Sequence, residues 1–93
     1  MMKKKEGFMT ANQREPYARE WLMAQVKAKP RYNDFKIVNT REIIQSVYKQ
    51  TIIYKFRCRY KDRTTAVMEE VERTFFVAYD YQDGKGEYMC PLL

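Results

Sequence analysis

Apolar and polar residues alternate strictly between residues 48 and 61. One side of this stretch carries Tyr48, Ile52, Tyr54, Phe56, Cys58 and Tyr60, and the other carries Lys49, Thr51, Lys55, Arg57, Arg59 and Lys61. Alternation with a period of two over this length predicts a long β-strand with one buried face. Residues 67–81 repeat the pattern, with one side made of Val71, Phe75, Val77, Tyr79 and Tyr81. The short polar segment 62–65 between the two runs predicts an antiparallel hairpin.

The register of this hairpin is predicted from its apolar and charged pairs. If paired positions sum to 129, the apolar pairs are Tyr54–Phe75, Ile52–Val77, Cys58–Val71 and Tyr48–Tyr81. The same register pairs base with acid on the other face, as Arg59–Glu70, Arg57–Glu72 and Lys49–Asp80. Each such cross-strand pair contributes roughly 0.2–1 kcal/mol. Residues 55–61 look like a basic and aromatic nucleic-acid platform, but we expect these charges to be neutralised by the neighbouring strand.

A helix is predicted before the hairpin. Glu15-Pro16 reads as an N-cap followed by proline at the first helical position. A helical stripe follows, made of Tyr17, Ala18, Trp21, Leu22, Gln25 and Val26. Pro30 predicts the end of the helix, and Trp21 is expected to pack beneath the sheet rather than to bind a ligand.

Two further strands complete the predicted fold. Residues 35–44 are expected to form one strand or two pieces of one, bulged near Asn39-Thr40, with a tight turn at Gln45-Ser46. This turn would place Ile37 opposite Tyr54 and Phe35 opposite Phe56. Residues 87–90 form a short last strand after a glycine-containing loop. The predicted fold class is α+β, with one N-terminal helix on a four-stranded antiparallel meander; residues 1–14 are expected to be a flexible basic arm and residues 15–93 a single domain.

The net charge of +6 is confined to the first part of this 93-residue chain. Residues 1–41 contain ten Lys/Arg and four Asp/Glu, which gives +6, whereas residues 42–93 contain eight of each. This asymmetry suits an acidic partner. The candidate basic patch consists of Lys3, Lys4, Lys5, Arg14, Arg19, Lys27, Lys29 and Arg31. With Tyr32 available for stacking, the patch makes nucleic-acid binding an alternative function.

The residue types that catalysis and cofactor binding need are scarce. The chain has no histidine, no C-x-x-C pair and only three glycines, so we expect no enzymatic activity, no zinc or other metal site, no phosphate-binding loop and no small-molecule substrate. Cys58 is expected to act as a small buried hydrophobic residue, and a Cys58–Cys90 disulfide would require an oxidising compartment. The first residues lack the apolar core of a signal peptide and no stretch is long enough to span a membrane, so a cytoplasmic location is expected.

An apolar patch on the outer face of the sheet favours a protein partner. Ile53 and Phe76 face each other there in the predicted register, and Val38 and Ile44 lie nearby. A small binding module without catalytic residues suits an inhibitor or adaptor, including the inhibitors encoded by mobile elements. Homodimerisation through the same face is equally consistent with the pattern.

A resemblance to a known fold family adds a second alternative. Gly7 lies in the arm, Gln45-Ser46-Val47-Tyr48-Lys49 lies at the predicted first hairpin, and residues 82–86 form the last one. Together with the helix and four-stranded meander, these features resemble cystatins, although Lys49 replaces the final glycine of their Q-x-V-x-G hairpin and their Pro-Trp pair is missing. The resemblance implies inhibition of papain-like proteases, with Gln45 and Val47 in contact with the partner. The chain also resembles small uncharacterised α-plus-meander domains of Bacteroidetes proteins.

Overall fold

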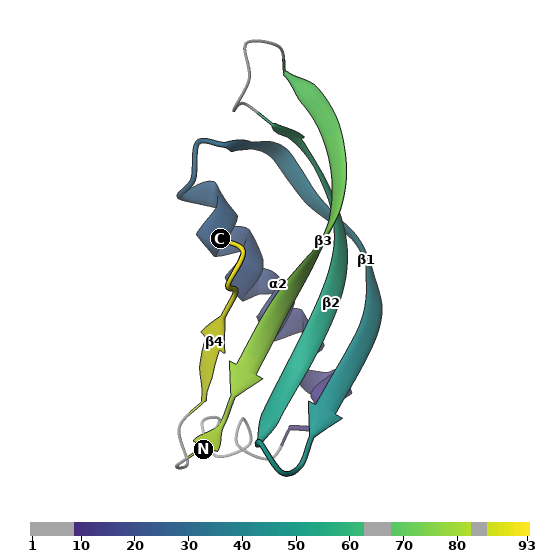
Figure 1. Cartoon of the computed structure of the whole chain (residues 1–93), viewed down its shortest axis with the longest axis vertical. Coiled ribbons are helices and arrows are strands. Elements are labelled where there is room, and N and C mark those ends of the chain that lie inside the picture. The colour runs from purple at the N-terminus through teal and green to yellow at the C-terminus, as the bar shows by residue number, and fades with distance from the viewer. Residues whose placement is uncertain (1–8, 63–67, 83–85) are drawn as a thin grey trace.

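One helix crosses one face of a four-stranded antiparallel sheet (Figure 1). The computed structural model describes residues 9–62, 68–82 and 86–93. The elements in chain order are α2 (Ala11–Lys27), β1 (Tyr32–Ser46), β2 (Thr51–Asp62), β3 (Glu69–Asp80) and β4 (Glu87–Met89). The strands are neighbours in the order β1-β2-β3-β4, which is a meander. The predicted α+β class and strand order are therefore confirmed.

The helix begins earlier than the proline signal predicted. Thr10 is the N-cap, and it forms a capping box in which its hydroxyl accepts from the Gln13 N–H at 3.1 Å while the Gln13 side chain accepts from the Thr10 N–H at 3.0 Å. Pro16 consequently lies inside the helix rather than at its first position. The predicted N-cap at Glu15 is wrong, because the capping box already satisfies donors one turn earlier. Residues 11–14 of the predicted arm are helical, and residues 1–8 lie outside the described residues.

The core lies between α2 and the inner face of the sheet. The helix buries a stripe at four-residue spacing, and the sheet buries the alternating apolar residues of β2 and β3; the fully buried large side chains include Leu22, Val26, Tyr54, Phe56, Tyr60, Phe75 and Val77. Trp21 is partly buried and stacks on Tyr88 with 5.8 Å between ring centroids. Trp21 therefore packs against the sheet as predicted, but at the margin of the core beside β4.

The register of β2 and β3 differs by two residues from the predicted one. Paired positions sum to 131, so that Phe56 faces Phe75 and Tyr54 faces Val77. A shift of two residues leaves each side chain on its predicted face, because side chains alternate with a period of two. Ring packing fixes the observed register, since Phe75 lies edge-on to Phe35 at 5.3 Å. β3 begins at Glu69, and Val67, the predicted start of this strand, lies outside the described residues.

β1 is irregular along its length. Its pairing with β2 shifts between Asn33 and Lys36, between Ile37 and Asn39, and between Thr40 and Glu42. The irregularity predicted near Asn39-Thr40 is thereby confirmed. The pairs predicted across this hairpin are wrong, because Ile37 lies opposite Cys58 and Thr40 lies opposite Phe56. Each extra residue of β1 moves the later pairs along β2.

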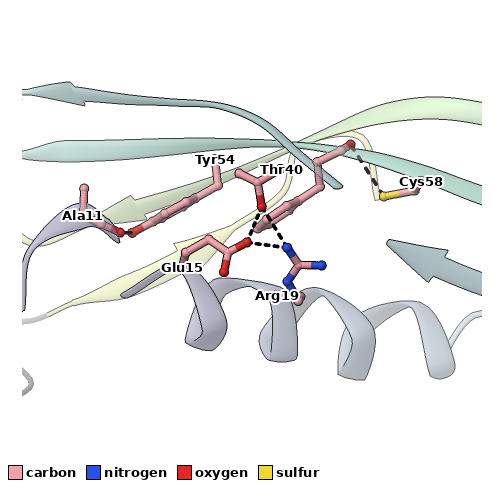
Figure 2. A network of polar contacts seen from close by, with 7 residues as sticks. Ala11, Glu15, Arg19, Thr40, Tyr54 and Cys58 are labelled. Carbon is pink, nitrogen blue, oxygen red and sulfur yellow. Dashed lines mark hydrogen bonds and ion pairs between the residues drawn. The ribbon is translucent and has the colours of Figure 1, made fainter. Parts of the chain in front are cut away.

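A polar cluster joins α2 to β1 (Figure 2). Arg19 Nη2 lies 2.5 Å from Glu15 Oε2 and donates to Thr40 Oγ1 at 2.8 Å. The Thr40 hydroxyl donates to the same Glu15 oxygen. We call these three residues the clamp. Burial by itself raises the pKa of Glu15, but hydrogen bonds from Thr40 and Arg19 and the charge of Arg19 together hold it below its ordinary value of 4.5.

Candidate protein-interaction surface

The turn between β1 and β2 presents two apolar side chains to solvent. Val47 is 80 % exposed and Tyr48 is 101 % exposed, the highest value among the large hydrophobic residues of the described part of the chain. The strand predicted to include Tyr48 on its buried face instead begins at Thr51, so this prediction is wrong. Gln45 and Ser46 were predicted to form the turn, but they pair with β2 as the end of β1, and the turn comprises residues 47–50.

Hydrogen bonds hold this turn from both sides. The Lys49 N–H donates to Ser46 Oγ at 3.3 Å, and the Thr51 hydroxyl donates to the Lys49 carbonyl at 2.9 Å. The Tyr81 N–H, which follows β3, donates to the Gln50 carbonyl at 3.0 Å. Gln50 takes a positive φ of 51°, which closes the turn without glycine. The exposed pair is therefore displayed on a backbone that is fixed by its neighbours.

A row of apolar residues crosses all four strands on the outer face of the sheet. On β1, β2 and β3 it lies two residues from the strand end that is near the 47–50 turn. The pairing places Ile44 beside Ile53, Ile53 beside Ala78, and Ala78 beside Met89. We call these four residues the apolar row. Ile44 and Met89 at its ends are 38 % and 42 % exposed. The row contains Ile53 and Ile44 of the predicted patch, and Ala78 and Met89 were missed because neither belongs to a long apolar run.

The other predicted patch residues lie in different positions. Phe76 is exposed on the outer face but lies opposite Lys55, whose Nζ is 5.5 Å from its ring centroid, and not opposite Ile53. The predicted Ile53–Phe76 pair is wrong because of the two-residue shift in register. Val38 is exposed at the bulge next to the Asn39–Arg57 pair. It is separated from the Ile53 row by four residues of β2, about 13 Å, and does not join the apolar row.

A pocket of about 230 Å³ lies on the inner side of this end of the molecule. Gln45 from β1, Tyr81 after β3 and Gly86 before β4 contribute to its lining, together with Arg14 of the helix. Arg14 is only 3 % exposed, and its guanidinium carbon lies 3.9 Å from the Tyr79 ring centroid. Gln45 thus faces the pocket rather than the outer surface where the apolar row lies.

The basic residues of β2 have acidic partners, as the sequence predicted, but Arg59 pairs with Glu72 rather than with the predicted Glu70. Ion pairs join Arg59 to Glu72 at 3.2 Å, Arg57 to Glu72 at 3.6 Å, Lys55 to Glu42 at 3.0 Å and Lys61 to Asp34 at 3.5 Å. The partners come from both neighbouring strands. These residues act chiefly as cross-strand contacts within the sheet.

The predicted basic patch is not assembled as one surface in the described residues. Arg14 is buried against Tyr79, so its assignment to an exposed basic edge is wrong. Arg19 belongs to the clamp, and Arg31 pairs with Asp62 at 3.3 Å. Lys27 and Lys29 are exposed near the end of α2. Lys3, Lys4 and Lys5 lie outside the described residues.

Both cysteines are free thiols. Cys58 lies fully buried on the inner face of β2, as predicted. Burial, with a smaller contribution from nearby Cys90, raises the pKa of the Cys58 thiol to about 12. Burial also raises the pKa of Cys90. Both thiols are therefore protonated at neutral pH and are poor nucleophiles.

Comparison of the chain with protein-family models, with curated proteins and with solved structures finds no match. In residues 9–62, 68–82 and 86–93, no helix has the length and apolar character needed to cross a membrane.

Proposed function

We propose that the protein is a non-enzymatic protein-binding module that acts as an inhibitor or adaptor by occupying a partner's surface. The observation that supports this most directly is the turn at residues 47–50, which holds Tyr48 and Val47 in solvent on a fixed backbone. Tyrosine is enriched among the residues that contribute most to protein interfaces. A turn whose backbone is already fixed also loses less backbone conformational entropy on binding.

The apolar row gives this anchor a wider contact area. Ile44 and Met89 are each about 40 % exposed, and the row extends across four strands beside the turn. A stable interface buries roughly 800 Å² on each partner, which is more than a single turn supplies. We therefore expect the partner to cover the turn and the apolar row together.

The experiment is affinity capture with crosslinking in a lysate of the source cell, with and without nuclease, comparing wild type with Tyr48→Ala. We expect one protein partner to be captured by the wild type after nuclease and to be lost with Tyr48→Ala or Ile44→Asp. Tyr17→Ala is the matched control, because Tyr17 is also exposed but lies on the helix. Capture of nucleic acid alone, or capture that is equal for wild type and Tyr48→Ala, would contradict the proposal. Sedimentation of the purified protein identifies a second copy as the partner if Tyr48→Ala dissociates a dimer.

Cystatin-type protease inhibition is a narrower form of the same proposal. It is favoured by one observation, the position of Gln45-Ser46-Val47-Tyr48-Lys49 at the end of the first hairpin. Inhibition of a panel of papain-like proteases by micromolar protein, abolished by Val47→Asp, would support it. A panel that stays fully active would exclude this form and leave the wider proposal to the capture experiment.

A further inference from the structure

β3 is much longer than the strand that covers its outer edge. β3 has 12 residues, and β4 pairs only with Ala78, Tyr79 and Asp80, which leaves residues 69–77 without a strand on that side among the described residues. Figure 1 shows the yellow chain after β4 diverging from β3 instead of continuing along it. Tyr88, Cys90 and Leu93 pack against the core. Within the described part of the chain, residues 69–77 of β3 therefore have an edge that no strand covers.

The backbone groups that face this edge follow from one hydrogen bond. The Tyr81 N–H donates to Gln50, so Tyr81 directs its backbone polar groups toward β2. In an antiparallel strand, alternate residues direct both N–H and C=O to opposite sides. The even-numbered residues of β3 consequently point away from β2. Above β4 these residues are Glu70, Glu72, Thr74 and Phe76, and they offer four donors and four acceptors along the edge.

The side chains next to the edge define what strand it would accept. The outer face carries a basic column on β2 and an acidic column on β3, formed by Glu70 and Glu72. The next column outward is therefore best filled by basic residues, since opposite charges on neighbouring strands stabilise a sheet. Val71 and Phe75 point to the inner face and favour apolar residues opposite them, whereas Arg73 between them favours an acidic residue.

A second copy of the same strand does not meet these requirements. Residues 69–77 carry three glutamates and one arginine, so two copies would bring together two segments of net charge −2. Like charges placed opposite each other destabilise strand pairing. An antiparallel pairing of two copies that includes all four edge residues places Glu72 opposite Thr74 of the second copy. In this pairing Arg73 lies opposite Arg73 of the second copy, which is a further repulsion.

We propose that the open edge of β3, residues 70–76, binds an extended peptide segment of a partner protein by strand addition, with basic residues alternating with apolar ones. Backbone hydrogen bonds from Glu70, Glu72, Thr74 and Phe76 hold the segment, and Glu70 and Glu72 select its basic residues. This site is separate from the turn that supports the proposed function, and either one can fail without the other.

The test uses ¹⁵N-labelled full-length protein and an end-blocked peptide, Tyr-Val-Thr-Glu-Lys-Val-Lys, whose residues are matched in order to Phe76 through Glu70. Hydrogen exchange of the free protein should show fast exchange at Glu70, Glu72 and Thr74 and slower exchange at Val71 and Phe75. Peptide added to about 2 mM should slow exchange of the edge amides roughly ten-fold. The control peptide carries N-methyl groups at the residues whose amides would face β3, and it should not bind.

Two variants make the result specific. Thr74→Pro removes a donor that faces the edge and leaves the ladder to β2 intact, so binding should fall at least about ten-fold. Glu70→Lys keeps the backbone and should weaken the lysine peptide about two- to five-fold while strengthening a peptide with glutamate in place of lysine. Glu70→Lys decides the question if Thr74→Pro fails to fold. Tyr48→Ala should bind the peptide as the wild type does.

Three results would overturn the inference. Edge amides that are already protected in the free protein would mean that the edge is covered, by a second copy if the protection rises with concentration. Absence of edge protection at the highest peptide concentration would mean that it accepts no such strand. Equal binding of the lysine and glutamate peptides by wild type and Glu70→Lys would remove the charge selection.

Discussion

Thr40→Val should destabilise the protein by loosening the contact between α2 and β1. The hydroxyl of Thr40 donates to Glu15 and accepts from Arg19, so one substitution removes two bonds of the clamp. Valine keeps the branched shape of threonine and its strand preference, so the loss is confined to the polar contacts.

The size of the effect follows from the exposure of the partners. A hydrogen bond to a charged group contributes about 1.5–3 kcal/mol when it is well shielded. The side chains of Arg19 and Glu15 are 36 % and 18 % exposed, so water replaces part of what Thr40 gives them. We expect a loss of about 1–2 kcal/mol at pH 7, measured as a shift of the urea midpoint without a change in slope. The same loss lowers Tm by about 4–8 °C for each kcal/mol in a domain of this size.

The loss should also depend on pH. The pKa of Glu15 is held below 4.5 in the folded protein, so its contribution to stability is complete above that pH and disappears as the pH falls through the folded pKa. Thr40→Val removes one of the bonds that lowers this pKa. The difference between wild type and variant should therefore be largest at pH 7 and should shrink toward pH 2.5.

Thr74→Val is the matched control for this experiment. Thr74 also lies in a strand, but on the outer face, where no side-chain hydrogen bond to another described residue is recorded. Its replacement should change stability by less than about 0.5 kcal/mol. A loss of stability in Thr40→Val that is no larger than in Thr74→Val, or that is equal at pH 7 and pH 2.5, would refute a stabilising role of the clamp.

Three further predictions concern the core. Gly86→Ala should destabilise by about 1–3 kcal/mol in urea unfolding, because a Cβ there would lie 1.5 Å from the Tyr79 hydroxyl oxygen; wild-type stability would show that the ring moves freely. Tyr54→Phe should lower the unfolding free energy by about 1 kcal/mol, since its hydroxyl donates to the Ala11 carbonyl at 2.8 Å, and an unchanged urea midpoint would contradict this. Cys58 should react with a thiol reagent at neutral pH only as the protein unfolds, because its pKa is raised to about 12; labelling as fast as that of a free thiol would refute its burial.

The alternation of residues predicted the fold class and the buried face, but it did not determine the register. A hairpin whose pairs sum to 129 and one whose pairs sum to 131 bury the same side chains and both pair acids with bases. The choice depends on the aromatic contacts of Phe75 with β1, which come from distant parts of the chain. The helix start, by contrast, has a signal in the sequence, because Thr10 and Gln13 have the spacing of a capping box. The prediction relied instead on Pro16 as the first helical residue.

The candidate surface was only partly predictable. Ile44 and Ile53 were identified because they fall on the polar side of the alternation. The alternation predicted Tyr48 on the buried face as the first residue of its series, whereas hydrogen bonds from Lys49 and Thr51 place the turn there. A turn that contains no Gly, Asn or Asp lacks the usual signal of a hairpin loop. Its exposure followed only from the three-dimensional pairing.

The two edges of the sheet differ in a way that bears on strand addition. β1 shifts register three times and contains Asp34 at a φ of 53°, and such bulges twist an edge away from regular pairing. β3 keeps one register with β2 from Glu69 to Asp80 and has no bulge on that side. A regular strand next to an uncovered edge offers evenly spaced donors and acceptors, whereas an irregular one does not. If the sheet only had to avoid association through its edges, bulges would be expected in β3 as well as in β1. The regular backbone of β3 is therefore explained by strand addition and not by protection against association.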